Sequence, residues 1–289
     1  MEHKTPLSYH FKDKHIWFDM ALLALLYVVA AYFPILKIVP LVASLELFSF
    51  FSFHLLAKRS RFQVQGFLGG FISSTAVFVQ MLFENKFASI SERDMLLTLF
   101  FALCAMLLEC LFIIFFLSEN VAFIYYLPFL TQLIIILAAI TYLNVSSSSR
   151  ISSKGTTDST VEIELLNDHP IIWKNVAKLS SLIFIFVYAM HFIGSEFGLS
   201  RGISTLLISL FEAHAILASV MTEWNLQSQS FDLMKLFFLI LLGNTISKSY
   251  LAIKGSNLTQ KWFFVAVMSG SLVASMGVTY IWSQTFPYN

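Results

Sequence analysis

The chain has 289 residues, of which 57% are hydrophobic and only 12% are charged, whereas soluble domains carry about 25% charged residues. Thirty-one phenylalanines do not fit inside one water-soluble core of this size, which excludes an ordinary soluble domain and indicates that lipid is the solvent. The formal net charge of +1 and the scattered basic residues give no general attraction to nucleic acid, so no nucleic-acid partner is expected.

In chain order, stretches of roughly 20 apolar residues predict membrane-spanning helices. About nine are expected, with these approximate bounds: 16–36, 38–57, 62–83, 94–117, 120–143, 171–195, 202–222, 232–253 and 260–283. The first follows Lys12 and Lys14 and is longer than the apolar part of a signal peptide, so it is expected to be a retained helix. The predicted fold class is therefore an all-α integral membrane protein.

The hydrophobic pattern repeats when the sequence is shifted by 139 residues, which places Ala76 on Ala215 and Glu109 on Lys248. The domain organisation predicted from this overlay is an N-terminal segment, an extra N-terminal helix, a first four-helix repeat, a Ser-rich linker, a second four-helix repeat and a tail: 1–15, 16–36, 37–143, 144–170, 171–283 and 284–289. Because four helices is an even number, both repeats are expected to enter the membrane from the same side. That predicts two parallel repeats related by an axis along the membrane normal.

The orientation of the chain is indicated by the basic residues that flank the first two predicted helices. They favour a cytoplasmic N-terminus in a multi-pass protein of the cell (cytoplasmic) membrane, and they are Lys4, Lys12, Lys14, Lys58, Arg59 and Arg61.

Ionisable groups inside the predicted helices are the first candidates for function, because a charge at bilayer depth costs at least about 2.5–3.5 kcal/mol. Glu109 and Lys248 lie at matching depths of two repeats, where they either hold the halves together or belong to a path for a solute or a proton. Asn244 precedes Lys248 by four residues and therefore shares its helix face.

Glu212 and His214 are two residues apart, so on a regular helix they point about 200° apart and do not hold one metal ion together. A metal site needs either a broken helix or ligands from other helices, and its existence is left open. Both residues overlay on Ser73 and Thr75, which predicts one polar layer at the interface between the repeats.

The predicted helix over 62–83 contains small residues in two groups. Gly66, Gly69 and Gly70 form a face suited to close helix packing. The run Ser73, Ser74 and Thr75 either extends this packing face or marks an unwound segment that exposes backbone dipoles to a solute.

Three motifs resemble a known family. The segment from Gly66 to Ala76 is similar to a "GxLGGxxSSTA" stretch, the segment from Ser209 to Ile216 resembles "SGxxDxDAI", and Asn244 to Lys248 resembles "NxxxK". These belong to a bacterial and archaeal polytopic membrane domain of unknown function that commonly forms the C-terminal part of MgtC/SapB-like proteins. The resemblance implies a bacterial-type membrane protein and, by analogy, a link to ion homeostasis.

The chain departs from this family at the charged positions. It has Glu212 and His214 where the family usually has Asp, and Glu109 where the family tends to have Arg. The family's "NP" is approximated by the segment from Asn167 to Pro170. The altered charges place a shared ion selectivity in question.

The leading functional hypothesis is a transporter or channel for a small ion or polar solute, with the solute path between the two repeats. Its candidate residues are Ser73, Ser74, Thr75, Glu109, Glu212, His214, Asn244 and Lys248. Protonation of the carboxylates or of the histidine would couple solute movement to a proton gradient, because histidine titrates near physiological pH. No cofactor is expected, and the expected partners are the lipid bilayer, the solute, and either a second copy or another membrane protein.

Two other classes of function remain open. A regulatory or assembly subunit would bind another membrane protein through its helices, and the polar layer would then be structural. An intramembrane enzyme is disfavoured because the sequence lacks a His-Glu-x-x-His helix, a Gly-x-Ser-x-Gly turn and a phosphate-binding glycine loop.

Overall fold

The structure is a computed structural model that describes residues 14–32, 61–83, 90–117, 122–145, 201–226, 233–255 and 258–285, and single residues within 39–47 and 173–188. All regular secondary structure in these ranges is helical. The elements are α2 (Lys14–Tyr32), α4 (Arg61–Phe83), α5 (Glu92–Leu117), η3 (Phe123–Tyr125), α6 (Leu127–Val145), α8 (Arg201–Ser209), α9 (Ala213–Leu226), α10 (Leu233–Lys254) and α11 (Lys261–Thr285). The predicted all-α fold is confirmed for the described part of the chain.

Four of the described helices, α5, α6, α10 and α11, are long and apolar enough to cross a membrane. They agree with the predicted spans over 94–117, 120–143, 232–253 and 260–283 to within several residues. α6 begins later than predicted because η3 precedes it and because Pro128, which lacks a backbone N–H, fits the first turn of a helix.

Other sequence predictions fall on parts of the chain that the structure does not describe. They are the segment 1–15 apart from its last two residues, the linker 144–170 beyond residue 145, the tail 284–289 beyond residue 285, and most of the predicted spans 38–57 and 171–195. The first predicted helix, over 16–36, corresponds to α2 as far as Tyr32.

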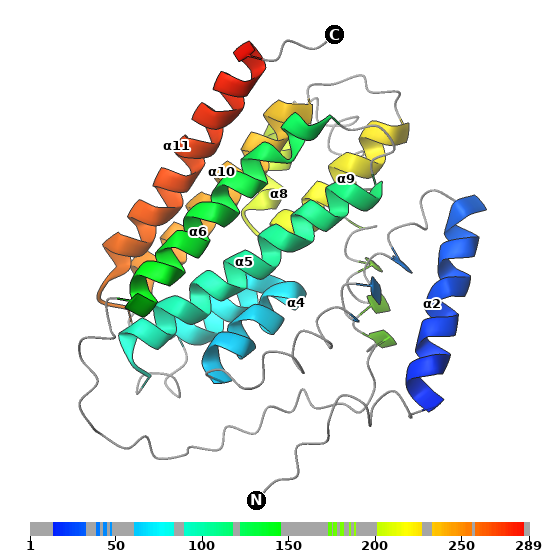
Figure 1. Ribbon diagram of the computed structural model, residues 1–289, viewed down its shortest axis with the longest axis horizontal. Helices are drawn as coiled ribbons and strands as arrows, with labels where there is room; N and C mark the ends of the chain where they lie inside the picture. Colours follow the sequence, from blue (N-terminus) through cyan, green and yellow to red (C-terminus); the bar gives the residue numbers. More distant parts are fainter. Residues whose placement is uncertain are drawn as a thin grey trace, which may run out of the picture.

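The core is built around α5, which is apolar on every side and packs against α4, α6 and α9 (Figure 1). A helix that is hydrophobic all round belongs in the interior of a helical protein. On the far side of the core, α10 packs against α4, α8, α9 and α11. α11 borders the bundle and leaves Trp262, Val273 and Tyr280 exposed.

α6 and α11 run antiparallel, side by side (Figure 1). Phe123, just before α6, lies 5.7 Å from the ring of Trp282 near the end of α11, whereas Tyr142 near the end of α6 lies 6.1 Å from Phe263 at the start of α11. α5 and α10 also run in opposite directions.

The ends of α5 and α10 establish their directions. Phe237 near the start of α10 lies 5.4 Å from Phe129 at the start of α6, the helix that follows the end of α5 in the chain. The backbone N–H of Gln260, in the connection from α10 to α11 and directly before α11, donates to the carboxylate of Glu92 at the start of α5. The start of α5 therefore lies beside the end of α10.

α4 is a helical hairpin and not one straight helix. Ser73 has an extended backbone (φ −167°, ψ 109°). A Cβ on Gly69 would lie 2.6 Å from Val77 Cγ2, although eight residues of straight helix would separate the two positions by about 12 Å. The chain therefore turns back at Ser73, and the two halves of α4 lie side by side. This element is called the first hairpin.

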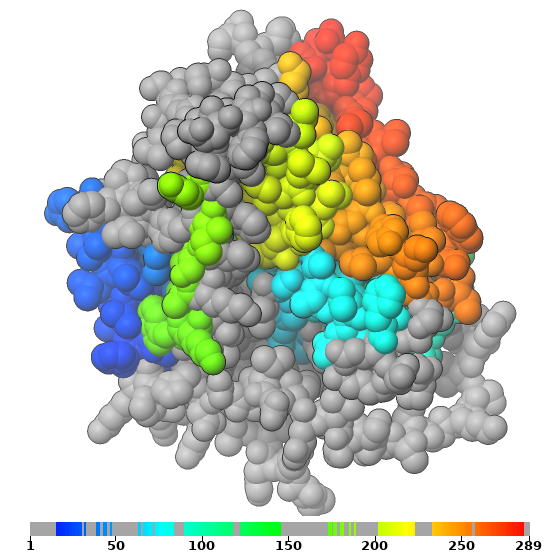
Figure 2. Space-filling view, turned by 180° about the vertical axis from the view of Figure 1, so that it is seen from behind, coloured from blue at the N-terminus to red at the C-terminus, as the bar shows by residue number. Residues whose placement is uncertain are grey.

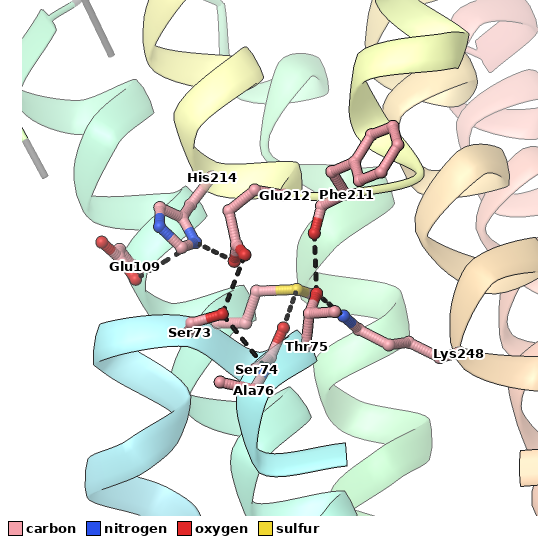
Figure 3. Close-up of polar contacts among 10 residues, drawn as sticks. Ser73, Ser74, Thr75, Ala76, Glu109, Phe211, Glu212, His214 and Lys248 are labelled. Carbon is pink, nitrogen blue, oxygen red and sulfur yellow. Dashed lines mark hydrogen bonds and ion pairs between the residues drawn. The ribbon is translucent and has the colours of Figure 1, made fainter. Parts of the chain in front are cut away.

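α8 and α9 form a second hairpin. α8 ends at Ser209, and the N–H groups of Phe211 and Glu212 donate to the carbonyl of Ile208, which closes a tight turn before α9. The two halves lie on the same side of this turn, opposite to the first hairpin (Figure 3). The tips of both hairpins meet near the middle of the molecule.

The prediction of two parallel four-helix repeats is wrong. α6 and α11 occupy equivalent positions in the 139-residue overlay, and they run in opposite directions. The physical reason is that the predicted spans over 62–83 and 202–222 are hairpins, which return to the side from which they start. A count that treats each of them as a crossing gives the second half the wrong direction.

Gly70→Ala is expected to destabilise the protein by about 1–3 kcal/mol, the usual cost of overpacking a tight contact. A Cβ on Gly70 would lie 2.5 Å from the carbonyl oxygen of Ala102 and 2.7 Å from its Cα, so α4 and α5 would have to separate. The check is a thermal unfolding measurement in detergent. Gly277→Ala in α11 is the control, because no atom lies within 4 Å of its added Cβ and alanine favours a helix more than glycine does, so it should not lower the unfolding temperature. Equal unfolding temperatures for both variants would contradict the prediction.

Candidate functional site

The two hairpin tips contact each other through hydroxyl groups of the first hairpin (Figure 3). Ser73 Oγ donates to Glu212 Oε2 at 2.9 Å, and Thr75 Oγ1 donates to the backbone carbonyl of Phe211 at 2.7 Å. Ser73 Oγ also accepts a hydrogen bond from the N–H of Ala76 at 3.2 Å, as an N-cap residue does. The break in α4 therefore has a local cause, and it places two hydroxyls at the tip.

Glu212 has a similar position at the second tip. It directly precedes α9, where the partial positive charge of a helix N-terminus favours a carboxylate. Its side chain is mostly buried, at 11% exposure. The turn before α9 also explains how Glu212 and His214 converge, since the separation of about 200° holds only on an unbroken helix.

His214 lies between two carboxylates. Its Nδ1 is 3.1 Å from Glu212 Oε1 and 3.7 Å from Glu109 Oε2 on α5. His214 and Glu109 are both almost fully buried, and neither nitrogen of the imidazole has a hydrogen-bond partner among the described residues, so its contacts with the carboxylates are electrostatic. Two acids and one base at these distances form a group that can hold and exchange protons without reaching bulk water.

Lys248 on α10 approaches the first tip from the other side. Its Nζ donates to Thr75 Oγ1 and lies 5.4 Å from the centre of the Phe78 ring. The side chain is 1% exposed. The pairing of Glu109 with Lys248 suggested by the overlay is replaced by two separate contacts, Glu109 with His214 and Lys248 with Thr75.

The remaining predicted residues surround this cluster. Asn244 lies one turn before Lys248, is 2% exposed, and its Nδ2 has no hydrogen-bond partner in the described part of the chain. Ser74 is fully buried and donates to Met106 Sδ at 3.5 Å.

The three glycines lie beneath the tip. Gly66 and Gly70 lie against the backbone of Thr98 and Ala102 on α5. Gly69 lies inside the hairpin against Val77.

A cleft of about 630 Å³ begins at the tips and follows the second half of α4. It is lined by Ser73, Thr75, Ala76, Val79, Gln80, Phe211 and Glu212. Sequence reasoning missed Gln80 and Phe211. Gln80 is a polar residue in an apolar helix, which was the available signal, whereas Phe211 contributes its backbone carbonyl and its residue type gives no signal. α4 (cyan) and the α8–α9 segment (yellow-green) meet on one face of the molecule (Figure 2).

The contacts of the cluster are related by the same 139-residue shift as the sequence. Ser73 and Glu212, which bond to each other, are 139 residues apart. The contact of Glu109 with His214 and that of Lys248 with Thr75 involve equivalent positions, because Glu109 overlays on Lys248 and Thr75 overlays on His214.

No group of three or more His, Cys, Asp or Glu side chains is placed to hold a metal ion among the residues that the structure describes. The cluster presents hydroxyl, carboxylate, imidazole, amide and ammonium groups to one small region. This chemistry is suited to a small polar or charged solute and to protons.

In the part of the chain that the structure describes, these features define an all-helical architecture in which four helices are long and apolar enough to cross a membrane and two hairpins meet at buried charges. Residues 41–255, well over half of the chain, match the family described as "Domain of unknown function (DUF4010)", and the chain belongs to this family. The resemblance to a domain of unknown function is thereby confirmed, while its association with MgtC/SapB-like proteins stays a prediction. No curated protein and no solved structure matches the chain.

Proposed function

We propose that the protein is a membrane transporter for a small ion or polar solute, with its solute site between the tips of the two hairpins. One observation carries this proposal: two helix breaks, at positions 139 residues apart, bring hydroxyl groups of α4 together with buried ionisable groups from α5, from α10 and from α9 with the turn before it. Broken helices at membrane depth are tolerated where they line a cavity or are buried in protein. They are also the usual place for solute and coupling-ion sites in transporters.

The membrane setting is supported by the four long apolar helices and by the apolar side chains on the outside of the bundle. In this setting both hairpins are re-entrant, entering the membrane from opposite sides without crossing it. The chain then consists of two inverted repeats related by an axis in the membrane plane, with the hairpin tips near that axis. The N-terminus on the cytoplasmic side of the cell membrane, expected from the basic residues, is part of the same proposal.

Proton coupling is assigned to the group formed by Glu109, Glu212 and His214. The imidazole lies within 4 Å of both carboxylates, so a proton on one member changes the charge balance of the others. Glu212 alone of the three lines the cleft. A proton or a cation that binds Glu212 from the cleft therefore changes the electrostatic environment of the two buried groups, Glu109 and His214.

The experiment that tests transport measures current on a sensor-supported membrane from purified protein in liposomes. pH is stepped first, followed by Mg²⁺, K⁺, Na⁺, chloride and phosphate. We expect a saturable current for one class of ion, and its loss in the double variant Glu109→Gln with Lys248→Met.

The outcome against the proposal is equally concrete. A current that survives both substitutions together excludes this cluster as the solute path. The absence of current from folded protein across the whole panel, together with the co-purification of one stoichiometric membrane protein, favours the regulatory or assembly subunit.

A further inference from the structure

Equivalent positions in the two hairpins differ in exposure. In the second half of α4, Ala76 is exposed, Val79 is 44% exposed and Gln80 is partly exposed, and all three line the cleft. The residues that overlay on them in α9 are Ala215, Ala218 and Ser219, and each of these is fully buried. Similar segments therefore have an open environment in one half of the chain and a closed one in the other.

The difference arises from packing. α4 and α9 both pack against α5 and α10, but the second half of α4 leaves one face open to the cleft. In two inverted repeats, each half can adopt the conformation of the other, and this exchange moves the opening from one side of the membrane to the other.

We infer that α9 holds a second mouth to the same solute site, closed in this structure, which opens to the opposite side of the membrane. It is lined by His214, Ala215, Ala218 and Ser219, the counterparts of Thr75, Ala76, Val79 and Gln80. Its ligand is the same small polar or charged solute, so the inference rests on the proposed transport function.

Two unpartnered polar atoms support the location of this mouth. Ser219 Oγ and His214 Nε2 are buried and have no hydrogen-bond partner among the described residues. A buried polar group without a partner is costly. Both atoms gain water or solute as partners when the α9 mouth opens.

One pair of equivalent positions is buried in both halves of the chain. Phe78 and its counterpart Leu217 are both fully buried. If the two halves exchange conformations, Leu217 therefore stays buried. Its exposure distinguishes the opening of a defined mouth from a general loosening of α9.

The test uses single cysteines in a background without Cys104 and Cys110, the two buried free cysteines of the described chain, each replaced by alanine. Gln80→Cys, Ser219→Cys and Leu217→Cys are reconstituted in oriented vesicles and treated with a membrane-impermeant maleimide from either side. We expect Gln80→Cys to react from one side, Ser219→Cys to react from the other, and Leu217→Cys to stay unreacted. Conditions that raise the reaction rate at one mouth should lower it at the other.

Reaction of Ser219→Cys from the same side as Gln80→Cys overturns the inference, and so does equal reaction of Leu217→Cys and Ser219→Cys. Flux without any reaction of Ser219→Cys also overturns it, while the proposed transport function survives. Reaction from opposite sides without flux of any tested ion supports the second mouth and contradicts transport of those ions. Ala218→Cys replaces Ser219→Cys if the latter variant does not fold.

Discussion

Lys248→Met is expected to lower solute flux about 10- to 100-fold while the protein stays folded. A hydrogen bond from a charged group contributes about 1.5–3 kcal/mol, and about 1.4 kcal/mol corresponds to a tenfold change in rate. Lys248 is 1% exposed and its Nζ donates to Thr75 in the wall of the cleft. Methionine retains most of the apolar length of lysine and removes the ammonium.

The same substitution separates a functional role from a structural one. Lys248 is a buried cation whose described hydrogen-bond partner is a neutral hydroxyl, and burying a charge costs free energy that an apolar side chain of similar size does not, so we expect an unchanged or higher unfolding temperature. Flux in liposomes and thermal unfolding in detergent are measured on the same preparation. The matched control is Lys254→Met, at the exposed end of the same helix, which should keep its flux. Normal flux in Lys248→Met would remove this lysine from the solute path.

His214→Gln is expected to abolish flux driven by a pH gradient and to retain flux driven by a solute gradient at equal pH. Glutamine preserves hydrogen-bonding capacity at this position, but it does not titrate between pH 5 and 8 as histidine does. Because His214 lies between Glu212 and Glu109, its loss leaves the two acids without a titratable group between them.

Both driving forces are compared in the same liposomes, with protein-free liposomes as the baseline. Gln132→Leu is the control, since Gln132 is a buried polar residue on α6, which provides no group to the cluster. A His214→Gln variant that still responds to the pH gradient would place proton coupling elsewhere. Equal loss of both fluxes would assign the histidine to solute binding.

The long helices could be predicted from sequence because a continuous apolar stretch has few alternatives. α5, α10 and α11 each contain more than 20 residues of this kind, and their predicted bounds differ little from the observed ones. A hydropathy pattern gives the length and polarity of an apolar segment but not the direction in which its helix runs. Two short antiparallel helices joined at Ser73 therefore have the same hydropathy as one long helix.

The polar cluster was partly predictable. Charge at membrane depth identified Glu109, Glu212, His214 and Lys248, which lie in the cluster. The same criterion also selects Glu46 and His191, which lie outside the described residues. Their partners could not be predicted, because pairing depends on the hairpin turns. The unwound alternative for Ser73 agrees with its extended backbone, and close packing agrees with the environment of Gly66 and Gly70.

The 139-residue overlay located the helix breaks better than it located the directions of the helices. Ser73 and Glu212, equivalent in sequence, both lie at breaks and bond to each other. A residue contacts its own counterpart only near a symmetry axis. An even number of predicted helices gives the wrong axis, because hydropathy does not distinguish a helical hairpin from a single long helix.

The contact between Ser73 and Glu212 also has an electrical consequence for the proposed transporter. A site on an axis in the membrane plane lies midway between the two membrane surfaces. An elementary charge that crosses the whole membrane gains or loses about 2.3 kcal/mol per 100 mV. An ion bound between Ser73 and Glu212 therefore experiences about half of this energy, roughly 1.2 kcal/mol per 100 mV, on the way in and the other half on the way out. Membrane voltage then acts equally on loading from one side and on release to the other.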